Sequence, residues 1–275
     1  MSPGRSWARY WEAQLVADRH EVEVGLADHR TVVFDTGSRT ARPVVFVHSA
    51  ALDQRLWETT VDGLPDYRCV TYDLRGHGRS SGAPIRGIDQ LAEDLLGVLD
   101  ALDLAQADVV GLSLGGLVAQ RIGAVARQRV RSLVLMATAA AMPVQPMLSR
   151  AGLLEDAGRA HTVETTLQRW FGDLPPTSGI GYARQCLDTV TPGDWRAVWE
   201  AMAGVDLTGG LATAPWPVTC IAGELDSSTP PSALATIAAT TPNSSVIEIS
   251  GAPHLIPLTH PLPVQSALLG HLSRS

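Results

Sequence analysis

Short, unbroken runs of hydrophobic residues recur along this chain. Runs without polar alternation are typical of strands that are buried on both faces, as in a parallel sheet. The segments predicted to be such strands are Val44–Val47, Cys69–Tyr72, Val109–Gly111, Leu133–Met136, Val218–Ile221 and Val246–Ile249. Two earlier segments, Val22–Leu26 and Thr31–Asp35, are predicted to be further strands joined by a turn at Asp28-His29.

Hydrophobic residues at helical spacing lie between these strands. One stripe precedes the Val109–Gly111 run and another follows it. The stripes comprise Ile88, Leu91, Leu95, Val98, Leu99 and Leu102, and then Leu114, Leu117, Val118, Ile122 and Val125. Alternation of strands and helices predicts an α/β fold, with a mostly parallel central sheet and helices on both faces.

The strand–helix alternation stops between residues 139 and 212. The hydrophobic spacing there is helical, and its large aromatic residues are Trp170, Phe171, Trp195 and Trp199. We therefore predict a helical cap at residues 139–212, inserted into a core domain made of residues 1–138 and 213–275. Near the N-terminus, one stripe predicts a short helix that packs on the core or forms a homodimer contact. Its residues are Trp7, Tyr10, Trp11 and Leu15.

Composition limits the classes of function. The formal net charge of −7 argues against a general nucleic-acid binder, which needs a cationic face. All 21 basic residues are arginine, so chemistry that needs a lysine amine is excluded. No apolar run reaches the roughly 18 residues of a membrane span, and residues 1–15 lack the apolar region of a signal peptide. Three cysteines without metal-ligand spacing indicate buried thiols, and we expect a cytoplasmic protein.

The strongest chemical motif is G-x-S-x-G at residues 111–115. It follows a predicted strand and opens a predicted helix, which is the setting of a catalytic serine on a sharp turn. The turn would lift the Ser113 hydroxyl clear of the sheet and point the Leu114 N–H at a developing oxyanion. Ser113 is the predicted nucleophile.

A second oxyanion donor is expected in the loop after Val44–Val47. That loop reads His48-Ser49-Ala50-Ala51, and the N–H of Ala50 is the predicted donor. His48 is expected to be a structural residue of the loop. In a later loop, Asp73 and Arg75 are expected to hold a rigid turn.

A serine nucleophile needs a base, and the base needs an acid that fixes its tautomer. For a G-x-S-x-G serine the chain order is serine, acid, histidine. The predicted acid is Asp226, after Val218–Ile221, with Glu224 and the more distant Asp206 as alternatives. The predicted base is His254, just beyond the last strand, with His260 as its alternative. The remaining histidines are expected to be solvated, and they are His20, His29, His77, His161 and His271.

With these motifs the chain resembles the α/β-hydrolase fold family over nearly its whole length. The segments that carry the resemblance are His48–Trp57, Asp73–Ser80, the Ser113 turn, Gly223–Asp226 and Gly251–His254. Leu167–Phe171, with Cys186 downstream and Gly251–His254, is also similar to 3-oxoadipate enol-lactonases and related small-ester and lactone hydrolases. The chain departs from most relatives at Ser49 and Ala51, where glycine is usual, and this leaves the substrate open.

The resemblance implies hydrolysis of a small ester or lactone through an acyl-enzyme, without a metal or cofactor. Ser49, Trp170 and Leu255 are expected to line the substrate pocket. The alternatives are a natural-product esterase or lactonase, and a member of the fold that keeps the triad but acts as a lyase, a cofactor-free oxygenase or a ligand receptor. A dehalogenase or epoxide hydrolase is disfavoured, because both resemble this chain but carry aspartate at position 113.

Overall fold

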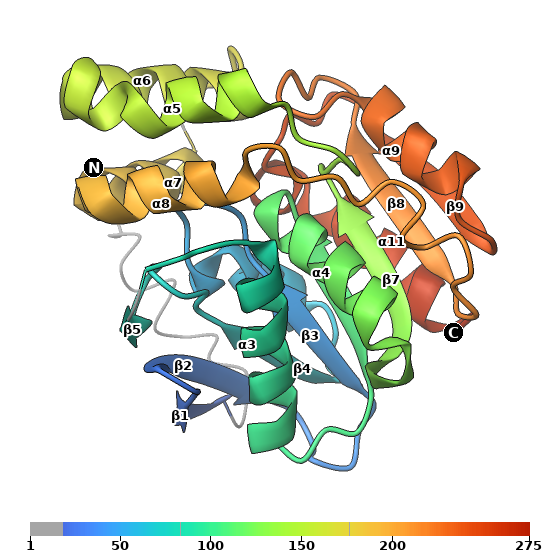
Figure 1. The fold of residues 1–275 in the computed structure, drawn as a ribbon. Helices are drawn as coiled ribbons and strands as arrows, with labels where there is room; N and C mark the ends of the chain where they lie inside the picture. The colour runs from blue at the N-terminus through green and yellow to red at the C-terminus, as the bar shows by residue number, and fades with distance from the viewer. Residues whose placement is uncertain (1–18, 83, 176) are drawn as a thin grey trace, which may run out of the picture.

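A twisted, mostly parallel sheet forms the centre of the computed structural model, which describes residues 19–82, 84–175 and 177–275 (Figure 1). The predicted helix around Trp7 lies outside these residues. The strands follow the order β1-β2-β4-β3-β6-β7-β8-β9, and β5 pairs with β2. The strands are β1 (Arg19–Gly25), β2 (His29–Thr36), β3 (Pro43–Val47), β4 (Arg68–Tyr72), β5 (Ser81–Gly82), β6 (Ala107–Leu112), β7 (Val130–Met136), β8 (Val218–Gly223) and β9 (Ser244–Ile249).

The pairing confirms the predicted fold class. β1 and β2 are antiparallel, and β2 also pairs antiparallel with β4. From β4 onward each neighbouring pair in the order is parallel. Strands β3, β4, β6 and β8 are almost wholly buried, as their unbroken hydrophobic runs predict.

The strand β9 departs from the prediction of burial on both faces. Three of its six side chains are exposed, including Val246 at 44%, and Ile249 alone is buried. The reason is its position, because β9 is the terminal strand of the sheet order.

Helices cover both faces of the sheet (Figure 1). α3 (Ile88–Ala101) and α4 (Leu114–Val125) lie in front in this view, and α11 (Pro261–Leu272) lies behind. The predicted stripe of α3 is buried, with Leu91, Leu95 and Val98 fully inaccessible to solvent. The remaining core helices are η1 (Gln54–Trp57), α2 (Glu58–Asp62), η2 (Arg127–Arg129), α9 (Pro231–Ala239) and α10 (Ile256–Thr259).

A group of helices follows β7 and precedes β8. They are α5 (Val144–Asp156), α6 (Gly158–Phe171), α7 (Ser178–Thr189) and α8 (Pro192–Met202), and we call residues 144–202 the helical insertion. Its two ends are joined, because Leu207 N–H donates to Ala140 O at 2.7 Å and Met142 N–H donates to Val205 O at 2.8 Å. The insertion stacks against one edge of the core (Figure 1).

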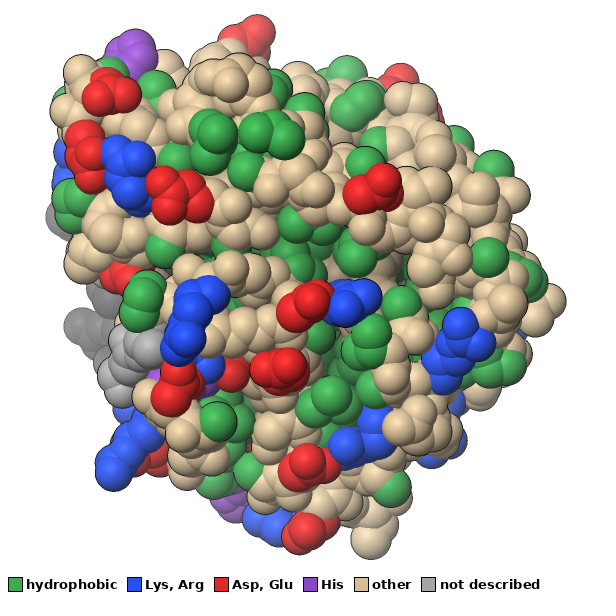
Figure 2. Space-filling view, in the orientation of Figure 1, with side chains coloured by type: hydrophobic (Ala, Val, Ile, Leu, Met, Phe, Trp, Pro, Cys, Tyr) green, Lys and Arg blue, Asp and Glu red, His purple; other side chains and the backbone are tan. Residues whose placement is uncertain are grey.

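Hydrophobic side chains gather in a hollow between the insertion and the core (Figure 2). On the surface between α3 and the segment after α8, a shallow groove of about 610 Å³ is lined partly by Ile88, Val205 and Leu207. No helix within the described ranges is both long enough and apolar enough to cross a membrane.

Candidate active site

Ser113 occupies a sharp turn between β6 and α4. Its φ of 55° and ψ of −111° lie outside the regions that residues with side chains ordinarily adopt. Neighbouring backbone holds the turn, since Ser113 N–H donates to Met136 O at 2.9 Å. Thr138 Oγ1 donates to Ser113 O at 2.8 Å. The strained serine is therefore fixed by the residues that end β7.

The flanking glycines are required by close packing. A Cβ on Gly111 would overlap the carbonyl oxygen of Gly115, and a Cβ on Gly115 would overlap the carbonyl oxygen of Val47. A Cβ on Gly116 would lie 2.6 Å from Cβ of Thr138. The missing side chains let α4 begin directly against the end of β3, and this exposes the serine hydroxyl at the turn.

His254 and Asp226 meet Ser113 from segments far along the chain. His254 Nε2 lies 3.1 Å from Ser113 Oγ, and His254 Nδ1 lies 2.8 Å from Asp226 Oδ2. Both side chains are almost completely buried. With an ionised Asp226, the proton on Nδ1 faces the carboxylate, and Nε2 is free to accept a proton from the serine.

The surroundings of Asp226 favour its ionised form. Its Oδ1 accepts from Ser228 N–H at 2.7 Å and from Thr229 N–H at 3.0 Å, and its Oδ2 accepts from Thr229 Oγ1 at 2.8 Å. Burial raises the pKa of this carboxyl, but the charge of His254 and the hydrogen bonds from His254 and Thr229 outweigh burial and leave the pKa lowered. Thr229 was not among the site residues predicted from the sequence, although a hydroxyl three residues after the acid was the available signal.

The loop after β3 lies beside the start of α4. Ala50 and Leu114 are buried there, and neither N–H donates a backbone hydrogen bond within the described part of the chain. Ala51 in this loop adopts a φ of 56°. The Ser49 hydroxyl is buried and has no hydrogen-bond partner among the described residues. That Ala50 and Leu114 donate to an oxyanion stays a prediction.

Backbone groups hold the His48 side chain in the same loop. Its Nδ1 lies 2.7 Å from Ser49 O, and its Nε2 accepts from Leu74 N–H at 2.9 Å. Burial lowers its pKa to about 4. Both ring nitrogens are occupied by backbone, as expected for a structural residue.

Sequence comparison places this geometry in a family. Residues 42–180 match the alpha/beta hydrolase fold family. The chain belongs to that family. It is 33% identical over 195 residues to 3-oxoadipate enol-lactonase 1 of Acinetobacter baylyi, covering 69% of this chain and 73% of the relative. It is also 30% identical over 255 residues to the putative non-heme bromoperoxidase BpoC of Mycobacterium tuberculosis, covering 84% and 93%.

A solved relative has the same architecture. A thermophilic esterase from Thermogutta terrifontis superposes with a TM-score of 0.83 at 28% identity, covering 93% of this chain and 98% of the esterase. Hydrolases that act on different substrates therefore share the fold of this chain.

The alternative acids and base of this α/β-hydrolase lie elsewhere. Glu224 accepts from Ser250 Oγ at 2.6 Å and from Gly251 N–H at 2.7 Å, so its carboxylate is tied to the turn after β9. Asp206 accepts from the backbone of Thr208, beyond the insertion. His260 Nδ1 lies 2.9 Å from Thr259 Oγ1, at the start of α11. Of the sequence candidates, Asp226 and His254 are those that reach Ser113.

Three histidines that we expected to be solvated are buried. They are His29, His77 and His271. His77 Nδ1 lies 2.9 Å from Arg75 O, and burial is the main reason that its pKa falls to about 4. The expectation was wrong for His77 because its ring packs against the buried His48 ring, with 5.1 Å between the centroids.

The turn after β4 was predicted to be held by Asp73 and Arg75. Asp73 does hold it, accepting from Arg79 N–H at 2.7 Å. The guanidinium of Arg75 instead pairs with Asp94 of α3 at 2.8 Å.

The predicted pocket residues take different positions. Leu255 follows His254 directly and is fully buried, as is Ser49. Trp170 is buried within the insertion, and its carbonyl oxygen accepts from His254 N–H at 3.1 Å. This bond connects the end of α6 to the backbone of the histidine that faces Ser113.

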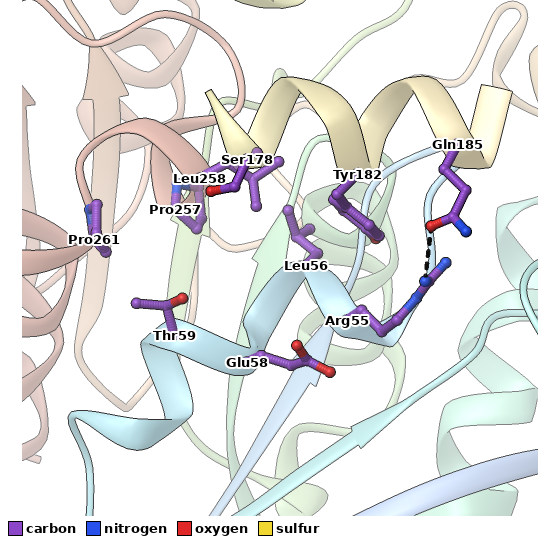
Figure 3. A pocket seen from close by; sticks show the side chains of 11 residues that line it. Arg55, Leu56, Glu58, Thr59, Ser178, Tyr182, Gln185, Pro257, Leu258 and Pro261 are labelled. Atoms are coloured by element: carbon purple, nitrogen blue, oxygen red, sulfur yellow. Dashed lines mark hydrogen bonds between the residues drawn. The ribbon is translucent and has the colours of Figure 1, made fainter. Parts of the chain in front are cut away.

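A cavity of about 470 Å³ lies between α7 of the insertion and the core (Figure 3). Tyr182 and Gln185 of α7 form its roof, Leu56 forms part of its floor, and Pro257 and Leu258 close one end. The three triad candidates are absent from its described lining. Across the described ranges, no group of three or more His, Cys, Asp or Glu side chains is placed to hold a metal ion.

Proposed function

We propose that this protein is a serine hydrolase that cleaves a carboxylic ester or lactone through an acyl-enzyme. The observation that carries the proposal is the array in which His254 lies 3.1 Å from the strained Ser113 and 2.8 Å from Asp226. Serine, histidine and acid arranged in this way activate a hydroxyl that is otherwise a weak nucleophile.

In the proposed first step, Ser113 Oγ attacks the substrate carbonyl carbon while His254 Nε2 accepts the serine proton. Asp226 stabilises the resulting imidazolium through the 2.8 Å bond to Nδ1. The carbonyl π electrons move to oxygen, and the N–H groups of Ala50 and Leu114 donate to that oxyanion. Such fixed donors in a buried site typically lower the barrier by about 3 kcal/mol each.

Collapse of the tetrahedral intermediate breaks the ester C–O bond, and His254 returns the proton to the leaving oxygen. An ester releases an alcohol, whereas a lactone keeps the new hydroxyl on its own acyl chain. Water then attacks the acyl-enzyme, with His254 accepting its proton. The products are the carboxylic acid and regenerated Ser113.

The proposed substrate is compact. The enol-lactonase relative acts on the enol-lactone of 3-oxoadipate by its name, and the insertion contributes Trp170, whose carbonyl oxygen accepts from His254 N–H. We propose that Ser49, Trp170 and Leu255 border the acyl group, and that the insertion acts as a cap over it. A natural-product esterase is the alternative at the same site.

The nucleophile is tested with a fluorophosphonate on the full chain. We expect labelling of one serine, located at Ser113 by peptide mass spectrometry, and no labelling of Ser113→Ala. A Ser273→Ala variant is the matched control and should be labelled normally. Labelling that persists in Ser113→Ala would refute the assignment, and labelling without turnover of p-nitrophenyl acetate would favour a receptor or another non-hydrolytic role.

Substrate size is tested with an acyl series from acetate to decanoate. A compact, capped site predicts that kcat/KM peaks at short chains. A steady rise with chain length would indicate an open groove and contradict the proposal of a cap. Comparing carboxylate-bearing lactones with neutral compact esters then separates the enol-lactonase assignment from the natural-product esterase.

A further inference from the structure

Two arginines of the helical insertion have no carboxylate partner in the part of the chain that the structure describes. The insertion carries Arg150, Arg159, Arg169, Arg184 and Arg196. Arg159 donates to two backbone carbonyls at the end of α7, while Arg184 and Arg196 each pair with a glutamate. Among the described residues, no acidic side chain pairs with Arg150 or Arg169. These two cations are therefore uncompensated.

Both arginines line one cavity of about 200 Å³ between α5, α6 and α8. On α6, His161, Thr165 and Arg169 are exposed and border the cavity, so it opens to solvent on that side. Its inner wall is formed by the buried rings of Trp195 and Trp199, among others. The described lining includes no Asp or Glu, and it includes neither Ser113 nor His254.

Arg150 is partly buried in this cavity. Its guanidinium lies over the Trp199 ring, 5.2 Å from the centroid. Burial, followed by the charge of Arg169, lowers the pKa of Arg150 to about 10. Removing a charged group from water without an opposite charge is costly, so an anion between the two guanidinium groups would be stabilised.

Trp199 supplies an independent observation. Its indole Nε1–H is buried and has no acceptor within the described part of the chain, although Trp199 lines the cavity. By contrast, the neighbouring Trp195 Nε1–H donates to Arg150 O at 2.7 Å. Buried donors nearly always have a partner, so this N–H, beside two arginines, is available to a ligand that carries an acceptor.

We propose that this cavity binds a small organic carboxylate, held by Arg150 and Arg169 and by the Trp199 indole N–H. A carboxylate matches the planar guanidinium group and supplies the acceptor that the indole lacks. Cavities of about 150 Å³ hold a molecule the size of benzene, so the available volume suits a short acid. The site is separate from Ser113 and is reached from solvent.

The site is connected to the catalytic histidine through α6. Trp170 lines the cavity, and its carbonyl oxygen accepts from His254 N–H at 3.1 Å. A carboxylate bound between the three helices would fix the end of α6 and hence the backbone of His254. Hydrolysis of an ester or lactone yields a carboxylate, so an acid of this class is a candidate effector.

The test uses the full-length Ser113→Ala protein, so that binding is measured without turnover and independently of the proposed hydrolysis. Malonate is titrated by calorimetry at constant ionic strength, with malonamide as the neutral control of similar shape. We expect saturable binding of malonate and none of malonamide. Equal binding of the two, or binding of neither, would overturn the proposal.

Variants locate the site. Arg169→Gln, at an exposed position, and Arg150→Gln should each weaken malonate binding at least tenfold, and Trp199→Phe should weaken it severalfold. Arg196→Gln is the matched control in the same insertion and should bind normally. Unchanged malonate binding in Arg169→Gln would show that the anion binds elsewhere. Loss of malonate binding when Ser113 of the native chain carries a phosphonate would show that malonate occupies the Ser113 site. Either result would refute a separate site.

Discussion

Asp226 and Glu224 show how two acids, two residues apart, take different roles. Glu224 N–H still donates to Ile249 O, so this residue continues the sheet and its carboxylate turns toward Gly251. Asp226 N–H donates to Gly223 O, which closes a turn and directs the carboxylate to His254. The difference in surroundings makes Asp226 alone suited to fix the histidine tautomer.

We predict that Asp226→Asn lowers kcat by about 10⁴-fold, the loss seen when the acid of a serine-protease triad becomes an amide. KM should change little, because Asp226 contacts His254 and not the substrate. Glu224→Gln is the matched control and should keep kcat within about tenfold. Steady-state kinetics with p-nitrophenyl acetate measure both losses. A larger loss of kcat in Glu224→Gln than in Asp226→Asn would assign the acid to Glu224.

The unit formed by β6, the Ser113 turn and α4 depends on contact with the end of β3. Gly115 lies against the carbonyl groups of Val47 and His48, and a Cβ there would come within 2.8 Å of the His48 oxygen. The same β3 end leads into the loop that carries Ala50. Any shift of α4 away from β3 therefore separates Leu114 from Ala50.

Gly115→Ala is accordingly expected to lower the free energy of unfolding by about 1–3 kcal/mol, typical of overpacking, and to lower kcat at least tenfold. Gly181→Ala is the control, because α7 leaves open space around Gly181 and a helical alanine is favoured by about 0.5–1 kcal/mol. Urea unfolding and ester kinetics measure both effects. Wild-type kcat in Gly115→Ala would contradict the role of this contact in aligning the oxyanion donors.

Across the whole molecule, a buried polar network ties the C-terminal helix to the sheet. His271 of α11 lies 2.8 Å from Thr219 Oγ1 and 2.7 Å from Ser132 Oγ, and Ser132 donates to Asp108 at 2.5 Å. Asp108 also pairs with Arg42 at 2.6 Å. The network joins β6, β7, β8, α11 and Arg42, the residue just before β3, and these segments are far apart in sequence.

Three buried histidines, one in this network and two in loops after β3 and β4, predict that the protein becomes less stable in acid. Burial lowers the pKa of His48, His77 and His271 from 6.5 to about 4. Between these values the unfolded chain binds more protons than the folded protein, so the free energy of unfolding falls as pH drops from about 6.5 toward 4. Each histidine contributes up to about 1.4 kcal/mol per pH unit. The pKa of Asp73, raised by burial, opposes the loss at the acid end.

Urea unfolding between pH 7.5 and 4.5, followed by tryptophan fluorescence, measures this dependence. His271→Gln should reduce the slope of the free energy of unfolding against pH. An identical slope in wild type and His271→Gln would show that His271 does not titrate differently in the folded and unfolded states.

The sequence alone determined the mostly parallel sheet, the succession of strands and helices along the chain, and the turn at Ser113. These features are local, since unbroken hydrophobic runs predict buried strands and glycines around a serine predict a tight strand–helix turn. The sequence also favoured Asp226 over Glu224 and Asp206 as the acid, and His254 over His260 as the base. It could not exclude these alternatives, because the choice depends on contacts between residues that are far apart.

Tertiary structure decided which side chains meet. His254 reaches Ser113 across 141 positions, and His271 reaches Ser132 across 139. The spacing of hydrophobic residues does not reveal such contacts, so the sequence did not predict that His271 is buried. Nor did it predict that Arg196 pairs with a carboxylate whereas Arg150 has no carboxylate partner among the described residues. Charge and burial belong to the packed molecule, because a side chain's solvation depends on neighbours that the folded chain alone brings together.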